Sequence, residues 1–173
     1  MIKLICDNQL IHNTVSNYLF HKNLLLSSNE NYRILIDIKY KEKGIILDIN
    51  GHKSEISLPI DINYLNSQIL KKIIHINFPI GDHKYFPYQR EISSLNNKSL
   101  LSDIQNLIIS NLIINQDGIE KDFLYDLIWK RDKSIHINKL DTHLTNLKKK
   151  LNQELNLKIN FQSQNKKLRL LID

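Results

Sequence analysis

Four leucines near the C-terminus constrain the fold of this chain more than any other feature. They fall at i, i+4, i+7 and i+11, namely Leu140, Leu144, Leu147 and Leu151. This spacing puts all four on one narrow face of an α-helix. Asn138 is a suitable N-cap, and Asp141 follows three residues later, where its carboxylate complements the helix dipole. The segment therefore predicts an amphipathic helix whose leucines pack on a core.

The remaining surface of this helix is polar and basic. The face opposite the leucines carries Thr142, Thr145, Asn146 and Lys149, and the flanks carry Lys139, His143, Lys148 and Lys150. Short polar side chains can recognise base edges while lysines bind phosphates. An ordinary surface helix with a solvated lysine run has the same composition, so the helix alone leaves both interpretations open.

Positive charge is concentrated around this helix. The 173-residue chain has a formal net charge of +6, and residues 130–173 hold eleven basic and four acidic side chains, a net charge of +7. Residues 101–129 have a net charge of −4, and residues 1–74 have +2. A basic segment of this kind is typical of a nucleic-acid-binding surface. The chain is also rich in Ile, Asn and Lys, so codon bias is an alternative source of some lysines.

Composition excludes several functional classes. No apolar run approaches the roughly 20 residues of a membrane span, and the N-terminus lacks the pattern of a signal peptide. Cys6 is the only cysteine, so an internal disulfide or a cysteine-cluster metal site is excluded. The histidines lack metal-ligand spacing, and no phosphate-binding loop or nucleophile motif is present. We expect a cytoplasmic protein that is not an enzyme, with no catalytic residue, metal or cofactor.

Residues 1–74 predict a small α/β domain. Its expected strands cover residues 3–6, 23–26, 33–40, 45–50 and 55–60, and its helices follow the caps Asn8 and Asp61. Asn50-Gly51 is a strong hairpin signal. Three consecutive strands with period two predict an antiparallel meander with one solvent-exposed face.

Residues 75–173 predict a second domain, which makes the chain α+β. Extended pieces are expected at residues 76–79 and 84–93, helices at 101–112 and 121–129, a polar loop at 130–137, and strands at 157–163 and 166–171. Three helices, the third one basic, followed by a β-hairpin predict a winged helix-turn-helix, whose third helix enters the major groove of DNA. Lys166, Lys167 and Arg169 lie at the hairpin tip and second strand, where they could contact phosphates.

Four separated pieces of this domain follow one family pattern in the correct order. They are Tyr85–Ile92, Leu101-Ser102 with Gln105, Gly118 with Leu124 and Trp129, and Asn138 with residues 140–151. Residues 84–171 thus resemble the C-terminal DNA-binding domain of OmpR/PhoB-type response regulators. By this resemblance and by helix face, Thr142, Thr145, Asn146 and Lys149 should enter the major groove, where Asn146 could pair with adenine and Lys149 with guanine.

The other side chains have different expected roles. His143, Lys148 and Lys150 are better placed for phosphates, although a histidine packed on a neighbouring side chain is the alternative for His143. Trp129 is expected in the core. The chain departs from the family pattern at Gln105, which replaces glutamate, at Asn146, where arginine is common, and at residues 163–168, which replace the family's glycine-containing wing turn.

Members of this family usually carry a receiver domain upstream, and residues 1–74 resemble a degenerate one. Asp7 is followed by Asn8, so at most half of the usual acidic pair remains, and Leu58 precedes Pro59 where the family has lysine. Asp48 is a possible vestigial phosphoacceptor, and the alternative is an ordinary polar residue of a strand. We expect this domain to support dimerisation independently of phosphate.

The combined prediction is a sequence-specific double-stranded DNA-binding transcription regulator that acts as a homodimer and is independent of phosphorylation. RNA polymerase is a second candidate partner. The alternative is a protein-interaction adaptor that uses the acidic residues 101–129. An RNA-binding protein is less favoured, because residues 138–151 lack the aromatic side chains that stack on single-stranded bases.

Overall fold

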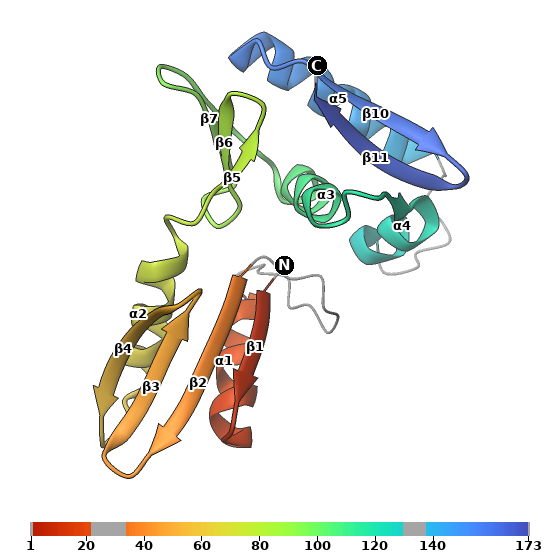
Figure 1. Cartoon of the computed structure of the whole chain (residues 1–173). Coiled ribbons are helices and arrows are strands. Elements are labelled where there is room, and N and C mark those ends of the chain that lie inside the picture. The colour runs from red at the N-terminus through yellow and green to blue at the C-terminus, as the bar shows by residue number, and fades with distance from the viewer. Residues whose placement is uncertain (1, 22–33, 130–137, 173) are drawn as a thin grey trace. The chain divides into compact units, whose positions relative to one another are not determined.

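The computed structural model describes residues 2–21, 34–129 and 138–172. The strand predicted at residues 23–26 and the loop predicted at 130–137 lie outside the described residues. The chain forms two compact units, Met1–Ile76 and Asn77–Asp173, close to the predicted boundary between residues 74 and 75 (Figure 1). Both units contain helices and sheets, so the α+β prediction is confirmed.

The first unit is built on a four-stranded sheet in the order β1-β2-β3-β4. Its strands are β1 (Ile2–Cys6), β2 (Ile34–Lys41), β3 (Gly44–Ile49) and β4 (His52–Ser57), and its helices are α1 (Gln9–His21) and α2 (Ile62–Ile73). Strands β2, β3 and β4 are antiparallel, which confirms the predicted meander. Positive φ angles at Asn50 and Gly51 form the predicted turn.

Local capping and periodicity explain the two helices of this unit. Asn8 Oδ1 accepts hydrogen bonds from the backbone N–H groups of Leu10 and Ile11, at 3.0 and 3.1 Å, and begins α1. Asp61 caps α2 in the same way. The buried faces contain Ile11, Val15 and Leu19 of α1, Leu65, Ile69 and Ile73 of α2, and Ile34, Ile36, Ile38, Ile45, Leu47 and Ile49 of the sheet. The alternate residues of β2 form the more exposed face of the sheet.

The strand connections of the first unit differ from those of a receiver domain. Receiver-type proteins have a doubly wound, mostly parallel sheet, whereas only β1 and β2 are parallel here. Strand β2 lies between β1, which ends just before Asp7, and β3, which contains Asp48, so these two strands are not neighbours. Within the described residues, only β1, α1 and β2 follow one another as a parallel strand–helix–strand unit. Strand β4 ends at Ser57, before Pro59, although we expected it to continue to residue 60.

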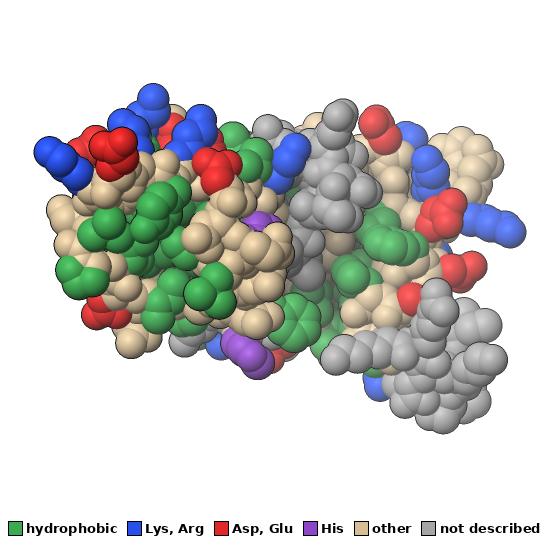
Figure 2. Space-filling view, turned by 90° about the horizontal axis from the view of Figure 1, so that it is seen from below, with side chains coloured by type: hydrophobic (Ala, Val, Ile, Leu, Met, Phe, Trp, Pro, Cys, Tyr) green, Lys and Arg blue, Asp and Glu red, His purple; other side chains and the backbone are tan. Residues whose placement is uncertain are grey.

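Several large apolar side chains of the first unit are exposed. They are Ile5, Leu10, Phe20, Tyr40, Leu58 and Tyr64. Figure 2 shows one face of the molecule, on which apolar side chains gather among interspersed acidic and basic ones. Exposed apolar clusters often mark interaction surfaces.

The second unit begins with a four-stranded antiparallel sheet in the order β5-β6-β7-β8. Its strands are β5 (Phe78–Ile80), β6 (His83–Phe86), β7 (Glu91–Ser93) and β8 (Lys98–Leu100). The sequence predicted the first three as extended segments and missed β8. Three residues are too few for a recognisable alternation, and β8 forms because a turn between Ser94 and Asn97 pairs it with β7.

Three helices and a small sheet complete the second unit. The helices are α3 (Asp103–Ile114), α4 (Lys121–Trp129) and α5 (Asn138–Leu155), and the strands are β9 (Ile119–Glu120), β10 (Ile159–Gln164) and β11 (Lys167–Ile172). The sheet order β10-β11-β9 brings the segment between α3 and α4 alongside the C-terminal hairpin. Ser102 and Gln105 form a reciprocal capping box, which begins α3.

A buried polar cluster joins the four-stranded sheet to α3. The Tyr85 hydroxyl donates to Asn106 Oδ1 at 2.6 Å and lies 2.6 Å from Ser110 Oγ. Asn106 Nδ2 donates to the carbonyl of Pro87 at 3.2 Å. Burial raises the pKa of Tyr85, because desolvation disfavours the phenolate. The cluster therefore holds a neutral phenol whose hydrogen bonds fix the sheet on the helix.

Candidate nucleic-acid interface

Helix α5 is oriented by its leucines as the sequence predicts. Leu140, Leu144, Leu147 and Leu151 are at most 5% exposed, and Leu155 extends the same face. The helix is one turn longer than expected. It ends where Asn156 adopts φ +53° and its N–H donates to the carbonyl of Asn152 at 3.0 Å, a left-handed C-terminal cap.

The polar residues opposite the leucines form a continuous exposed surface. Thr142, Thr145, Asn146 and Lys149 are all exposed, as predicted. The extra turn adds Gln153, which lies four residues after Lys149 on the same face and is also exposed. We missed Gln153 because the leucine spacing was followed only to residue 151. This outward surface, Thr142, Thr145, Asn146, Lys149 and Gln153, offers hydroxyl, amide and ammonium groups.

One flank of α5 packs against α4 through aromatic side chains. The rings of His143 and Trp129 have centroids 5.7 Å apart, and those of Tyr125 and Trp129 have centroids 4.6 Å apart. Lys139 Nζ lies 5.5 Å from the centre of the Trp129 ring, within the range of a cation–π contact. Trp129 packs between the two helices, as expected, but it is only partly buried. Residues 130–137, which follow Trp129, lie outside the described residues.

His143 has a lowered pKa in this environment. Desolvation by burial is the main cause, and the positive charge of Lys139 is the second. The neutral imidazole is therefore favoured, and the histidine packs on a neighbouring ring, which was the alternative interpretation. A phosphate contact by His143 stays a prediction.

The remaining basic residues of α5 lie in two different environments. Lys150 is partly buried, and its Nζ donates to the carbonyl of Leu100, which directs it toward β8. Lys148 is exposed, and its Nζ donates to Asn160 Oδ1 at the start of the hairpin. Lys148 thus lies between the helix and β10, while Lys150 lies on the opposite flank. Their predicted phosphate contacts are untested.

The hairpin brings its basic residues to the turn that precedes α4. Lys166, Lys167 and Arg169 are exposed, and the turn itself uses Asn165 and Lys166, with φ +51° and +63°, one residue later than expected. Arg169 Nε donates to the carbonyl of Asp117 at 2.9 Å. A Cβ atom at Gly118 would lie 2.9 Å from Arg169 Cγ, so glycine permits this close approach. One N–H of Arg169 is therefore used within the protein.

The first residue of α4 is also tied to α5 and the hairpin. Lys121 Nζ lies 3.2 Å from Asp141 Oδ1, and the Lys121 N–H donates to the carbonyl of Lys166 at 3.0 Å. Lys121 thus connects the first turn of α5 with the hairpin tip. These contacts fix the hairpin beside α5. The exposed basic groups of the hairpin and of α5 therefore keep a fixed position relative to one another.

Asp48 has a structural partner in the first unit. Its Oδ1 accepts a hydrogen bond from the Gly51 N–H at 2.7 Å, which stabilises the β3–β4 turn. Across the sheet it is in register with Asp37 on one side and Lys53 on the other. Within the described ranges, no three His, Cys, Asp or Glu residues gather as a possible metal site. The interpretation of Asp48 as an ordinary strand residue agrees with these contacts, and its phosphorylation is untested.

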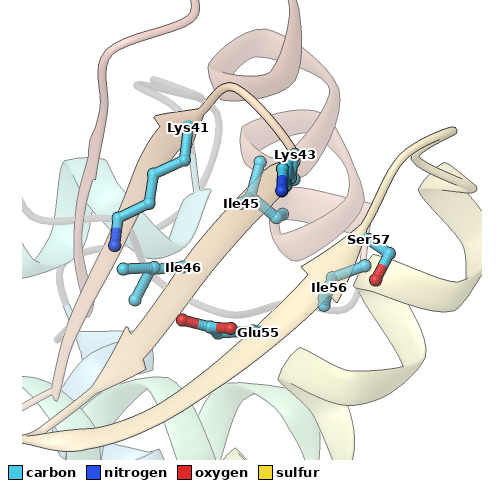
Figure 3. Close-up of a pocket in the computed structure, with 8 residues that line it drawn as sticks. Lys41, Lys43, Ile45, Ile46, Glu55, Ile56 and Ser57 are labelled. Carbon is cyan, nitrogen blue, oxygen red and sulfur yellow. The ribbon is translucent and has the colours of Figure 1, made fainter.

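A separate hollow of about 280 Å³ lies at the β2–β3 turn of the first unit (Figure 3). Lys41, Lys43 and Glu55 contribute side chains to its wall. Gly44 is required there, because an added Cβ would lie only 2.2 Å from the carbonyl oxygen of Ile56. With two basic groups and one acidic group, this hollow favours an anionic ligand less than the basic surface of α5 does.

No family model and no curated protein matches this chain. None of the helices in the described part of the chain has the length and apolar character needed to cross a membrane.

Proposed function

We propose that this protein is a sequence-specific double-stranded DNA-binding transcription regulator whose second unit is an OmpR/PhoB-type winged helix-turn-helix. The observation that carries the proposal is the orientation of α5. Its leucines are buried, and Thr142, Asn146 and Lys149 face outward beside a basic hairpin. Residue types of this kind can form bidentate contacts with bases in the major groove.

The order of elements in the second unit supports the winged helix. Helices α3, α4 and α5 precede the β10–β11 hairpin, and the short strand β9 between the first two helices pairs with β11. The hairpin is thereby held against the helices, as a wing requires to contact DNA next to the recognition helix. The proposal includes no enzymatic activity.

DNA binding can be tested by selecting bound sequences from a random duplex pool and measuring affinity by fluorescence anisotropy. Several lysine–phosphate contacts should make the affinity fall steeply with salt, by about 0.9 log units in K per log unit of salt for each contact. A selected motif with a steep salt slope is expected. No enriched sequence together with a flat salt response would refute the proposal.

Lys149 provides a more specific test of the recognition surface. Replacing Lys149 with alanine should cost about 1–3 kcal/mol on the selected duplex and much less on a random duplex, if its ammonium group contacts a base. Lys84→Ala removes the same charge from an exposed position on β6, outside this surface, and is the control. Equal losses on both duplexes would assign Lys149 to a phosphate instead.

The first unit is proposed to support a homodimer, and phosphorylation is not required. Asp48 accepts a hydrogen bond within its own turn, and Leu58 stands where receiver domains have lysine. Incubation with acetyl phosphate, followed by intact-mass measurement and DNA titration, tests this. Labelling at Asp48 accompanied by tighter DNA binding would contradict it.

A second candidate function is an adaptor that binds RNA polymerase or another regulator. Phe123 on α4 is 57% exposed, and Asp122 and Glu120 beside it are exposed and acidic. An apolar side chain among carboxylates favours a protein partner with a basic surface. Retention of purified polymerase without any DNA shift at low salt would favour this function over the first.

A further inference from the structure

A hollow beside α5 adds Lys158 to the lysines of the candidate interface. It has a volume of about 420 Å³ and lies between α5 and the start of β10. Its lining consists of Thr145, Lys148, Lys149, Asn152, Lys158 and Ile159. Three lysines therefore line one hollow, and its lining contains no carboxylate.

A neighbouring hollow provides a contrast. It has a volume of about 480 Å³ and shares Lys148 and Thr145 with the first, but its lining includes Asp141 and Lys121. The Asp141 carboxylate lies 3.2 Å from Lys121 Nζ and offsets its charge. The lining of the first hollow has three lysines and no carboxylate. An anion is therefore favoured there.

Local structure positions the lysines of the first hollow. Lys148 Nζ donates to Asn160 Oδ1, which holds that side chain between helix and hairpin. Lys158 is exposed and stands between the buried Leu157 and Ile159, so its side chain projects away from the core. The left-handed cap at Asn156 turns the chain back at the end of α5 and brings Lys158 beside the helix. The site is thus formed by both elements.

We propose that this hollow binds a backbone phosphate of duplex DNA, with Lys158 as a contacting residue beside Lys148. This rests on the proposed function, because it assumes that α5 approaches DNA. A phosphodiester carries one negative charge and oxygen acceptors that match ammonium donors. Such a contact fixes the orientation of the recognition helix without reading sequence. Asn152 can donate a further hydrogen bond from its amide.

The first test replaces Lys158 with alanine in the full chain. Lys84→Ala removes the same charge from an exposed position on β6 of the same unit and is the matched control. We expect Lys158→Ala to weaken binding about three- to tenfold, equally on selected and random duplexes. The slope of log K against log salt should become shallower by about one. Lys84→Ala should change neither value, and the circular dichroism melting curves of both variants should match that of the unchanged protein.

The second test removes the partner charge from the DNA. Single methylphosphonate groups are introduced, one position at a time, along the selected duplex. At one position the neutral group should weaken binding of the unchanged protein at least as much as Lys158→Ala does. At that position it should weaken binding of the Lys158→Ala protein by a smaller factor, because the two changes share one contact.

The results separate this inference from the proposed function. Salt-dependent binding of the unchanged protein, with Lys158→Ala equal to it in affinity and slope, would overturn the phosphate site and leave DNA binding intact. A loss confined to the selected duplex would also overturn it, because phosphates carry no sequence information. Absence of duplex binding by the unchanged protein at low salt would overturn both.

Discussion

The first prediction at the scale of a single residue concerns the buried polar cluster around Tyr85. Replacing Tyr85 with phenylalanine removes the hydroxyl that bonds Asn106 and approaches Ser110, and leaves these buried groups with fewer partners. We expect a loss of about 1–3 kcal/mol in the free energy of unfolding, measured by urea denaturation. Tyr88→Phe, at a partly exposed position of the same unit, should change it by less than about 0.5 kcal/mol. Equal effects of the two substitutions would rule out a stabilising role for the cluster.

His143 makes stability depend on pH. Its folded-state pKa lies below the ordinary value of about 6.5, because burial and Lys139 both disfavour the imidazolium. The stability that neutral His143 contributes is therefore fully present above about pH 6.5 and is lost as the pH falls from there toward the folded-state pKa. Urea midpoints of the unchanged protein should fall more than those of His143→Gln between about pH 7.5 and 5.5. Parallel pH profiles for the two proteins would contradict this.

The identity of a residue does not by itself show whether the residue belongs to the candidate site. The outward positions of Thr142, Asn146 and Lys149 follow from helix periodicity, so the sequence predicted them correctly. Lys158 was missed because it follows the helix and is not on its polar face. Alternation between Leu157 and Ile159 indicated that its side chain projects outward, but only the chain reversal at Asn156 brings it beside α5.

At the scale of an element, the orientation of α5 is open to a direct test. Leu147 is completely buried, so Leu147→Ala should lower the free energy of unfolding by about 2–5 kcal/mol, through lost burial and the resulting cavity. Gln153→Ala, on the exposed face of the same helix, should change it by less than about 0.5 kcal/mol. If thermal or urea unfolding tolerates both substitutions equally, the leucine face is not packed inward.

Two of the shortest strands, β8 and β9, were not predicted from the sequence. Strand β8 has three residues and β9 has two, and neither is long enough to show a period of its own. Their backbone hydrogen bonds come from partners elsewhere in the unit, β7 for the first and β11 for the second. Longer elements such as α4 and β2 were predicted within one or two residues, because each carries enough apolar positions to define its buried face.

At the scale of the whole molecule, the first unit should control dimerisation. Phe20 is 66% exposed on α1, and an added charge there should weaken an apolar contact between two copies. We expect Phe20→Asp to shift sedimentation equilibrium toward the monomer, whereas Leu95→Asp in the second unit, at a fully exposed leucine, should not. Binding to a duplex with two half-sites should weaken for Phe20→Asp only, because the linked second contact is lost. Equal sedimentation of both variants and the unchanged protein would exclude this surface of α1 as the dimer contact.

The sequence by itself determined the faces, the caps and the main turns of this protein. The leucine spacing of α5, the caps Asn8 and Asp61, and the Asn50-Gly51 turn all depend on residues within a few positions of one another, and local periodicity is sufficient to predict them. The tertiary structure decided which neighbour each flank of α5 meets. His143 lies on Trp129, and Lys148 bonds Asn160, because packing brings together residues that are more than ten positions apart. Such contacts depend on how whole elements pack, and no spacing within a single element encodes that.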